Sequence, residues 1–234
     1  MHATTVSSFV LSYGGAPRRV RVAIPRDVEA APSLLLLFDG QNVLGDEGSH
    51  AGGWHAHQAI PRLPKTVRRP VIVAVDHGYA RRIDELWHHV DPFLRFVTHE
   101  VLPAAEHHAR RRFDPEARVI GGSSLGGLAS LLALARHPRI FRGAIAMSPS
   151  MWVSPRAFLH ELRHAHYVPG TRAYVDVGYR ESPAMIRCAR AVPDVLAARL
   201  PPAQILWRPD RRGRHREKDW RRRLPKALRF AFHR

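Results

Sequence analysis

The chain has 234 residues, of which 45% are hydrophobic, and a single cysteine. It is therefore long enough to bury a substantial core, and it cannot form an internal disulfide. No apolar run reaches the length of a membrane span, and the first fifteen residues lack the basic start and apolar block of a secretory signal. We expect one domain over residues 1–234, a reducing and hence cytoplasmic setting, and no membrane contact.

The formal net charge of +17 raises the question of a nucleic-acid partner. Of the 37 basic residues, 34 are arginines, and a bias of that kind also follows from genomic base composition. The arginines form short clusters at 110–112, 211–216 and 221–223, without interleaved aromatic residues or a nucleic-acid-binding motif. We expect no specific nucleic-acid partner and keep a noncatalytic or polyanion-binding module as an alternative.

Apolar runs bounded by turn residues alternate along the chain with longer helical stretches. Strands are predicted at 4–12, 18–24, 34–38, 71–75, 118–121, 143–147, 172–177 and 205–208. Helices are predicted at 54–62, 91–111, 125–136, 183–199 and 216–232. This order predicts an α/β-hydrolase fold, with a mostly parallel central sheet, helices on both faces and no large lid domain.

Residues 122–126 spell Gly-Ser-Ser-Leu-Gly between the predicted strand 118–121 and the predicted helix 125–136. This G-x-S-x-G pattern is typical of a nucleophile elbow, in which the serine takes a strained backbone conformation and its hydroxyl stands clear of the sheet. The flanking glycines remove side chains that would collide with neighbouring backbone. Ser124 is the predicted nucleophile, and the alternative is a glycine-rich turn without chemistry.

A serine nucleophile needs a histidine base and an acid, which follow it in this order in α/β hydrolases. His215 lies just after the last predicted strand, where a loop can bring the imidazole over the elbow. The other downstream histidines fall on helices or in the tail and are better explained as solvated or packed side chains. For the acid we favour Glu181, which follows the strand 172–177, over Asp176, which lies inside that strand.

An oxyanion hole needs two N–H donors, one after the nucleophile and one from the loop after an earlier strand. The first is predicted to be the backbone N–H of Leu125. The second is predicted to be the backbone N–H of Gln41, in the segment Asp-Gly-Gln-Asn that follows the strand 34–38. An ordinary turn between a strand and a helix is the alternative for this segment.

Several side chains are candidates for contact with substrate. Trp54, Met151 and Trp152 lie on loops expected near the elbow, where they form either an apolar wall or part of the core. Cationic side chains border the acid and base loops and favour an anionic ester if they face the cleft: Arg180, Arg211, Arg212 and Arg214. The histidine-rich spots at 54–57, 88–89 and 107–108 lack a metal-ligand set, so we expect neither a metal nor a cofactor.

Taken together, these segments resemble the putative esterase (esterase D) family of α/β hydrolases, closest to its enterochelin-esterase-like branch. LLLLFDGQNVLGDEG is similar to the family's strand and oxyanion loop, and VIGGSSLGGLASLLALARHPRIFRGAIAMSPSMWV to its elbow, helix and following strand. VDVGYRES resembles the acid segment and GRHREKDWRRRLPKALRFAF the histidine segment. The stretch RRIDELWHHVD resembles the family but lacks the proline expected after its glutamate.

The resemblance implies the same residues that their positions indicate: Ser124, His215 and Glu181 as the triad, with Gln41 and Leu125 as oxyanion donors. It implies a carboxylic-ester hydrolase that works through an acyl-enzyme on a small to medium ester of aryl, acyl or siderophore type. An acyltransferase with the same triad is the alternative. The expected partner is this small-molecule ester, and the chain is either a monomer or a homo-oligomer.

Overall fold

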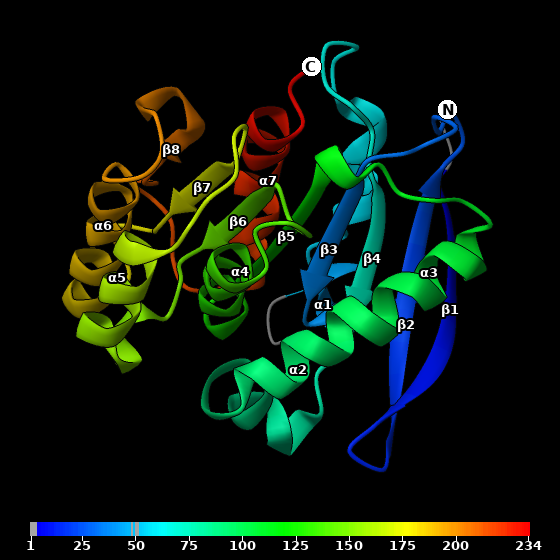
Figure 1. Ribbon diagram of the computed structural model, residues 1–234, viewed down its shortest axis with the longest axis horizontal. Helices are drawn as coiled ribbons and strands as arrows, with labels where there is room; N and C mark the ends of the chain where they lie inside the picture. Colours follow the sequence, from blue (N-terminus) through cyan, green and yellow to red (C-terminus); the bar gives the residue numbers. More distant parts are fainter. Residues whose placement is uncertain (1–3, 48, 50–51) are drawn as a thin grey trace.

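The computed structural model describes residues 4–47, 49 and 52–234, so the start of the N-terminal segment and Gly48 of the predicted oxyanion segment lie outside it. Within this part, eight strands form one sheet in the order β1-β2-β4-β3-β5-β6-β7-β8 (Figure 1). β1 and β2 run antiparallel to their neighbours at one edge, and the other strands are parallel. The strands are β1 Thr4–Tyr13, β2 Ala16–Pro25, β3 Leu34–Phe38, β4 Val71–Val75, β5 Arg118–Ser123, β6 Gly143–Met147, β7 Arg172–Asp176 and β8 Ile205–Trp207. The predicted mostly parallel sheet is confirmed.

Four of the five predicted helical segments are present in the expected order, and the described residues also form two helices outside the predicted ranges, at 40–43 and 155–164. The α-helices are α1 Gly40–Val43, α2 Val90–Phe96, α3 Leu102–Ala109, α4 Leu125–Arg136, α5 Pro155–His164, α6 Pro183–Leu196 and α7 Glu217–Ala231. The helix expected over 91–111 is α2 and α3 joined by a π-helical turn at Val97–Val101. The helix expected over 54–62 is wrong: it is two 3-10 turns, Ala56–Gln58 and Ile60–Arg62, because Pro61 offers no N–H for a continuous helix.

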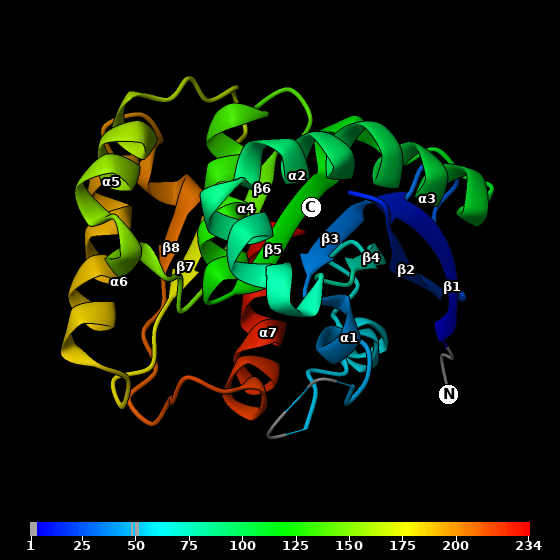
Figure 2. The same ribbon diagram turned by 90° about the horizontal axis from the view of Figure 1, so that it is seen from below.

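The two faces of the sheet are covered by different segments. Side chains of a strand alternate between the faces, so Leu34 and Leu36 lie on the face that α2 to α6 cover, whereas Leu35 and Leu37 lie on the other face. That second face is covered by α7 and by the segment 54–67, and Figure 2 shows α7 on the side of the sheet opposite to α2 and α4. Both faces are buried, which explains why the central strands are apolar at every position.

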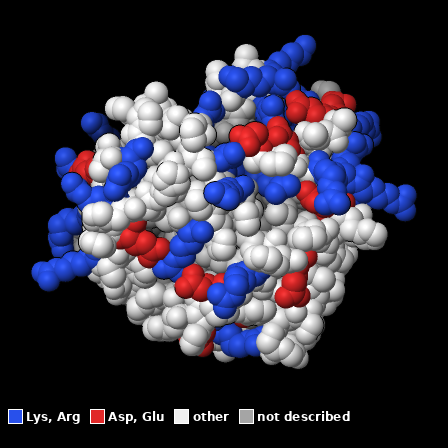
Figure 3. Space-filling view, viewed as in Figure 1, with Lys and Arg blue, Asp and Glu red and all other residues white. Residues whose placement is uncertain are grey.

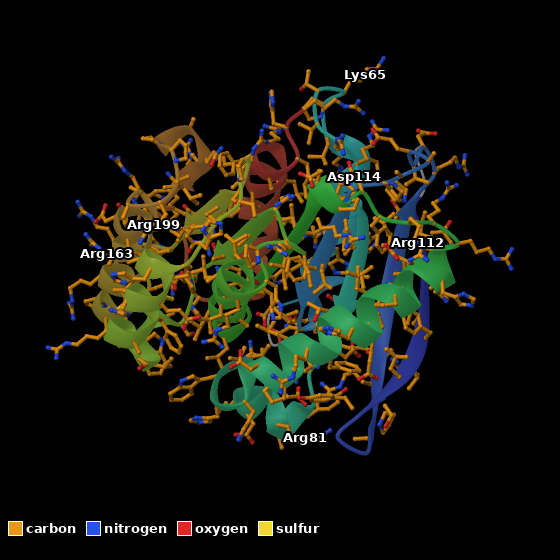
Figure 4. The ribbon with its side chains drawn as sticks, viewed as in Figure 1. Lys65, Arg81, Arg112, Asp114, Arg163 and Arg199 are labelled. Carbon is orange, nitrogen blue, oxygen red and sulfur yellow. The ribbon has the colours of Figure 1, made fainter. Side chains whose placement is uncertain are left out.

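The basic residues are spread over the surface. Figure 3 shows Lys and Arg scattered over one face with Asp and Glu between them, and no continuous stripe. Arg112, in the segment that follows α3, projects from the body of the molecule (Figure 4), and its side chain is 88% exposed while it binds Glu106. In the part of the chain that the structure describes, no helix has both the length and the apolar character to cross a bilayer.

Candidate active site

The predicted elbow forms the junction between β5 and α4. Ser124 stands between the two elements with φ 57° and ψ −123°, a backbone conformation that non-glycine residues rarely adopt. A methyl group on Gly122 would lie 2.7 Å from the backbone of Gly126, so the turn can close only if residue 122 is glycine. The Ser124 side chain is half-buried, and its Oγ lies 3.1 Å from Oγ of Ser150.

Three neighbouring parallel strands each end in a residue with positive φ. Asp39 after β3 has φ 61°, Ser124 after β5 has φ 57°, and Ser148 after β6 has φ 46°. None of the three is glycine, and such backbone strain concentrates at functional sites because the surrounding structure must hold it in place. The strained residues mark the carboxyl edge of the sheet as the candidate site.

The structure brings His215 and Glu181 together across 34 residues of sequence. The Nδ1 atom of His215 lies 2.9 Å from Oε2 of Glu181, and the imidazole packs edge-on against the Trp220 ring at 4.9 Å between centroids. The Glu181 side chain is fully buried, and the His215 side chain is 33% exposed. Burial raises the pKa of Glu181, but hydrogen bonds from His215, Ser148 and the Gly178 N–H outweigh it and hold that pKa below its usual value.

Asp176, the alternative acid, lies elsewhere in the network. It is the last residue of β7, as expected, and is completely buried. Its carboxylate accepts hydrogen bonds from the Tyr174 hydroxyl at 3.0 Å and the Ser148 N–H at 3.1 Å, and forms an ion pair with Arg223 at 3.4 Å. Burial raises the pKa of Asp176 to about 6, against the opposing effect of Arg223. Of the two carboxylates, only Glu181 contacts His215.

The two predicted oxyanion donors lie at the ends of adjacent strands. Gln41 is in α1 directly after β3, and Leu125 begins α4 directly after β5, which pairs with β3. Within the described residues, neither N–H donates to another backbone carbonyl in the turns and caps around the site. Both residues stand in the first turn of a helix, where backbone N–H groups have no intrahelical acceptor. The Gln41 side chain is buried, and its Oε1 accepts the His77 N–H at 3.1 Å.

Arg82 braces the oxyanion loop, a role that the sequence analysis missed. Its Nε and Nη2 donate to the two carboxylate oxygens of Asp39, each at 2.8 Å, in a bidentate pair. The carboxylate of Asp39 also lies against the elbow, because a methyl group on Gly126 would come within 3.3 Å of its Oδ2. The stretch RRIDEL contained the signal, but sequence alone does not pair Arg82 with a residue 43 positions earlier.

A second ion pair, formed by Glu85 of the same stretch, links the antiparallel edge of the sheet to the loop after β4. Arg18 of β2 is 1% exposed and donates to both carboxylate oxygens of Glu85, at 2.8 and 2.5 Å. The same guanidinium donates to the carbonyl of Asp76 at 2.8 Å. The loop that carries Arg82 is therefore anchored at both ends.

The candidate substrate contacts divide into buried and exposed side chains. Trp54 is 1% exposed and packs 6.1 Å from the ring of Trp220, and Met151 is fully buried, so both belong to the core. Trp152 is 52% exposed on the loop after β6. Two further aromatic residues, which the sequence analysis did not single out, are also exposed on loops at this edge: Tyr79 at 71% and Tyr179 at 48%. Within the described residues, no group of three or more His, Cys, Asp or Glu side chains could hold a metal ion.

Comparison with known proteins places this geometry in a family. The model of the family described as "Putative esterase" matches residues 12–231. The chain belongs to this esterase family. A curated relative, iron(III) salmochelin esterase of Escherichia coli O6:H1, is 28% identical over 145 residues, which cover 60% of this chain and 34% of the relative.

Solved structures share the fold of this esterase-family chain. The enterobactin esterase FES from Shigella flexneri, in the presence of enterobactin, superimposes with a TM-score of 0.79 at 24% identity and covers 96% of this chain and 57% of its own. The BES protein from Bacillus cereus has a TM-score of 0.79 at 17% identity, and the match covers 98% of this chain and 95% of BES. The α/β-hydrolase fold is thus confirmed. The matched part of the chain spans about a third of the length of the curated relatives and a little over half of the length of FES.

Proposed function

We propose that this chain is a serine carboxylic-ester hydrolase with Ser124 as nucleophile, His215 as base and Glu181 as acid. The observation that carries the proposal is the 2.9 Å contact between His215 and Glu181, formed at the same sheet edge as a strained serine at the head of a helix. The alternative, a turn without chemistry, does not account for a histidine and a buried carboxylate paired at that edge. Membership of the esterase family supports the same reaction.

In the proposed mechanism, Nε2 of His215 takes the Ser124 proton as Oγ attacks the ester carbonyl. The N–H groups of Gln41 and Leu125 donate to the oxyanion that forms. The intermediate collapses when His215 protonates the departing alcohol, leaving an acyl-enzyme, and water activated by His215 then releases the acid. Glu181 accepts a hydrogen bond from Nδ1–H of His215 throughout, while the proton stays on the imidazole, and its negative charge stabilises the imidazolium.

In the first step, the Ser124 hydroxyl must donate to Nε2 of His215. Its Oγ bonds to Ser150, and within the described residues no hydrogen bond joins it to His215. Catalytic hydrogen bonds often tighten only when substrate binds, so a change of χ1 at Ser124 is the expected first event. Ser150 is the partner that holds the hydroxyl in the resting site.

For the substrate, we propose an aryl or siderophore-type ester. Three exposed aromatic side chains lie on the loops after β4, β6 and β7, namely Tyr79, Trp152 and Tyr179, and planar rings of this kind stack on aromatic groups. The exposed Arg180 follows Tyr179 and favours an anionic ester. The similar structures include complexes described with enterobactin and with 2,3-di-hydroxy-N-benzoyl-serine, which supports this class.

Labelling with a fluorophosphonate probe tests the nucleophile. Wild type and the Ser123→Ala variant should be labelled, because Ser123 is buried beside the elbow, whereas Ser124→Ala should not be labelled and should lose hydrolysis of p-nitrophenyl esters. Labelling that persists in Ser124→Ala contradicts the assignment. Product analysis with a competing alcohol distinguishes hydrolysis from acyl transfer.

The substrate class has a separate test. KM for anionic aryl esters should rise with salt, while KM for neutral esters of the same acyl group stays constant, because salt screens the arginines at the site. An equal salt response for the two esters contradicts the anionic preference and leaves the nucleophile assignment intact.

A further inference from the structure

Ser148 lies directly behind the Glu181–His215 pair and takes no part in the steps above. It follows β6, is fully buried, and has φ 46°. This conformation favours glycine, so a serine here is maintained at a cost in backbone strain. Because its side chain is inaccessible, contact with substrate does not account for it.

The hydroxyl of Ser148 makes three hydrogen bonds. Its Oγ lies 3.1 Å from Nε1 of Trp220, 2.9 Å from Nη2 of Arg223 and 2.6 Å from Oε1 of Glu181. The indole and guanidinium groups can only donate, so they occupy the two acceptor positions of the hydroxyl. The hydroxyl proton is left for Glu181, which fixes the direction of that bond.

This bond determines how Glu181 faces His215. Oε1 of Glu181 accepts from Ser148 and from the Gly178 N–H at 2.8 Å, which leaves Oε2 for Nδ1 of His215. A carboxylate held in this way keeps the Nδ1 proton on the imidazole, so that Nε2 is free to accept a proton. The backbone of Ser148 is held in turn by Asp176, whose main-chain carbonyl and Oδ1 both accept its N–H, at 3.0 and 3.1 Å.

We infer that Ser148 is a positioning residue that orients the Glu181 carboxylate, and through it His215, and that the strained backbone at residue 148 is retained for this hydroxyl. The buried Arg223 and Trp220 support this role, because the hydrogen bonds that they donate to the Ser148 hydroxyl leave its own proton to be donated to Glu181. The inference rests on the proposed function of Ser124, His215 and Glu181.

A matched pair of variants separates positioning from stability. Ser148→Ala and Ser148→Gly both remove the hydroxyl and leave Trp220 and Arg223 without this acceptor, but only glycine relieves the positive φ. We expect Ser148→Gly to melt at a higher temperature than Ser148→Ala. We expect both to lose about 10- to 100-fold in kcat, by analogy with the loss of other orienting partners, with KM changed less than about twofold.

Ser148→Cys, which keeps a weak donor, should recover part of the lost kcat. The inference is overturned if either variant keeps the wild-type kcat, if kcat returns together with the melting temperature in Ser148→Gly, or if the loss appears in KM alone. Failure of the proposed function is read separately, from wild type and Ser124→Ala, before any Ser148 variant is measured.

Discussion

Gly178 and Gly213 hold the acid loop against the base loop, and a single methyl group at Gly178 should separate the loops. That methyl would lie 2.3 Å from the carbonyl carbon and oxygen of Gly213, where ordinary contact begins at 3.4 Å. The loops must therefore move apart by about 1 Å, which stretches the 2.9 Å bond between His215 and Glu181 beyond hydrogen-bond range. A misplacement of about 1 Å costs on the order of 100-fold in rate, and overpacking costs about 1–3 kcal/mol of stability.

The assay for Gly178→Ala is kcat on a p-nitrophenyl ester, together with the rate of fluorophosphonate labelling and the urea midpoint. We expect kcat and the labelling rate to fall together while the protein stays folded, because the sheet and both cores are untouched. Gly45→Ala is the matched control, since a methyl group at Gly45 meets nothing within 4 Å. A Gly178→Ala protein with wild-type kcat refutes the view that this contact sets the geometry of the pair.

Two further predictions concern stability. Glu85→Gln should lower the free energy of unfolding by about 3–5 kcal/mol, because it leaves the buried Arg18 without its carboxylate. Urea titration measures this loss. The control is Glu116→Gln, which removes an exposed partner of Arg142 and should have little effect on the same quantity. Burial lowers the pKa of His77, whose Nδ1 accepts the Tyr79 N–H at 2.9 Å. The unfolded chain therefore binds more protons, so this contribution to stability is present above pH 6.5 and is lost as the pH falls below it. His77→Asn, which keeps an acceptor, should show a smaller drop in melting temperature between pH 7.5 and 5.5, and an unchanged drop would contradict the assignment.

The strand positions along the chain, the elbow and the loop that carries His215 were predictable because each depends on local pattern. The alternation of apolar runs with helical stretches predicted a mostly parallel sheet. The glycines at 122 and 126 mark a turn whose packing admits no side chain at Gly122. Chain order in α/β hydrolases then restricted the base and acid to the loops after β7 and β8. The contact between His215 and Glu181 agrees with that restriction, and their catalytic roles stay a prediction.

Other features depend on contacts between distant segments, which a single sequence does not reveal. Arg82 with Asp39, and Ser148 with Trp220, join residues 43 and 72 positions apart. Trp54 is buried because it packs against Trp220 of α7, and nothing in its flanking sequence distinguishes it from the exposed Trp152. The 3-10 turns at 56–62 reflect Pro61, which has no N–H to donate and therefore interrupts a continuous helix.

The edge position of β8 affects how a newly made chain acquires activity. Seven of the eight strands precede residue 205, so a chain emerging from the ribosome can form most of the sheet while His215 is still inside the exit tunnel. At that stage the face around Leu35 and Ile72 lacks the cover of α7. α7 covers this face and also carries Trp220 and Arg223, which bond to Ser148 at the site. The same helix thus completes the hydrophobic core and supports the proposed triad.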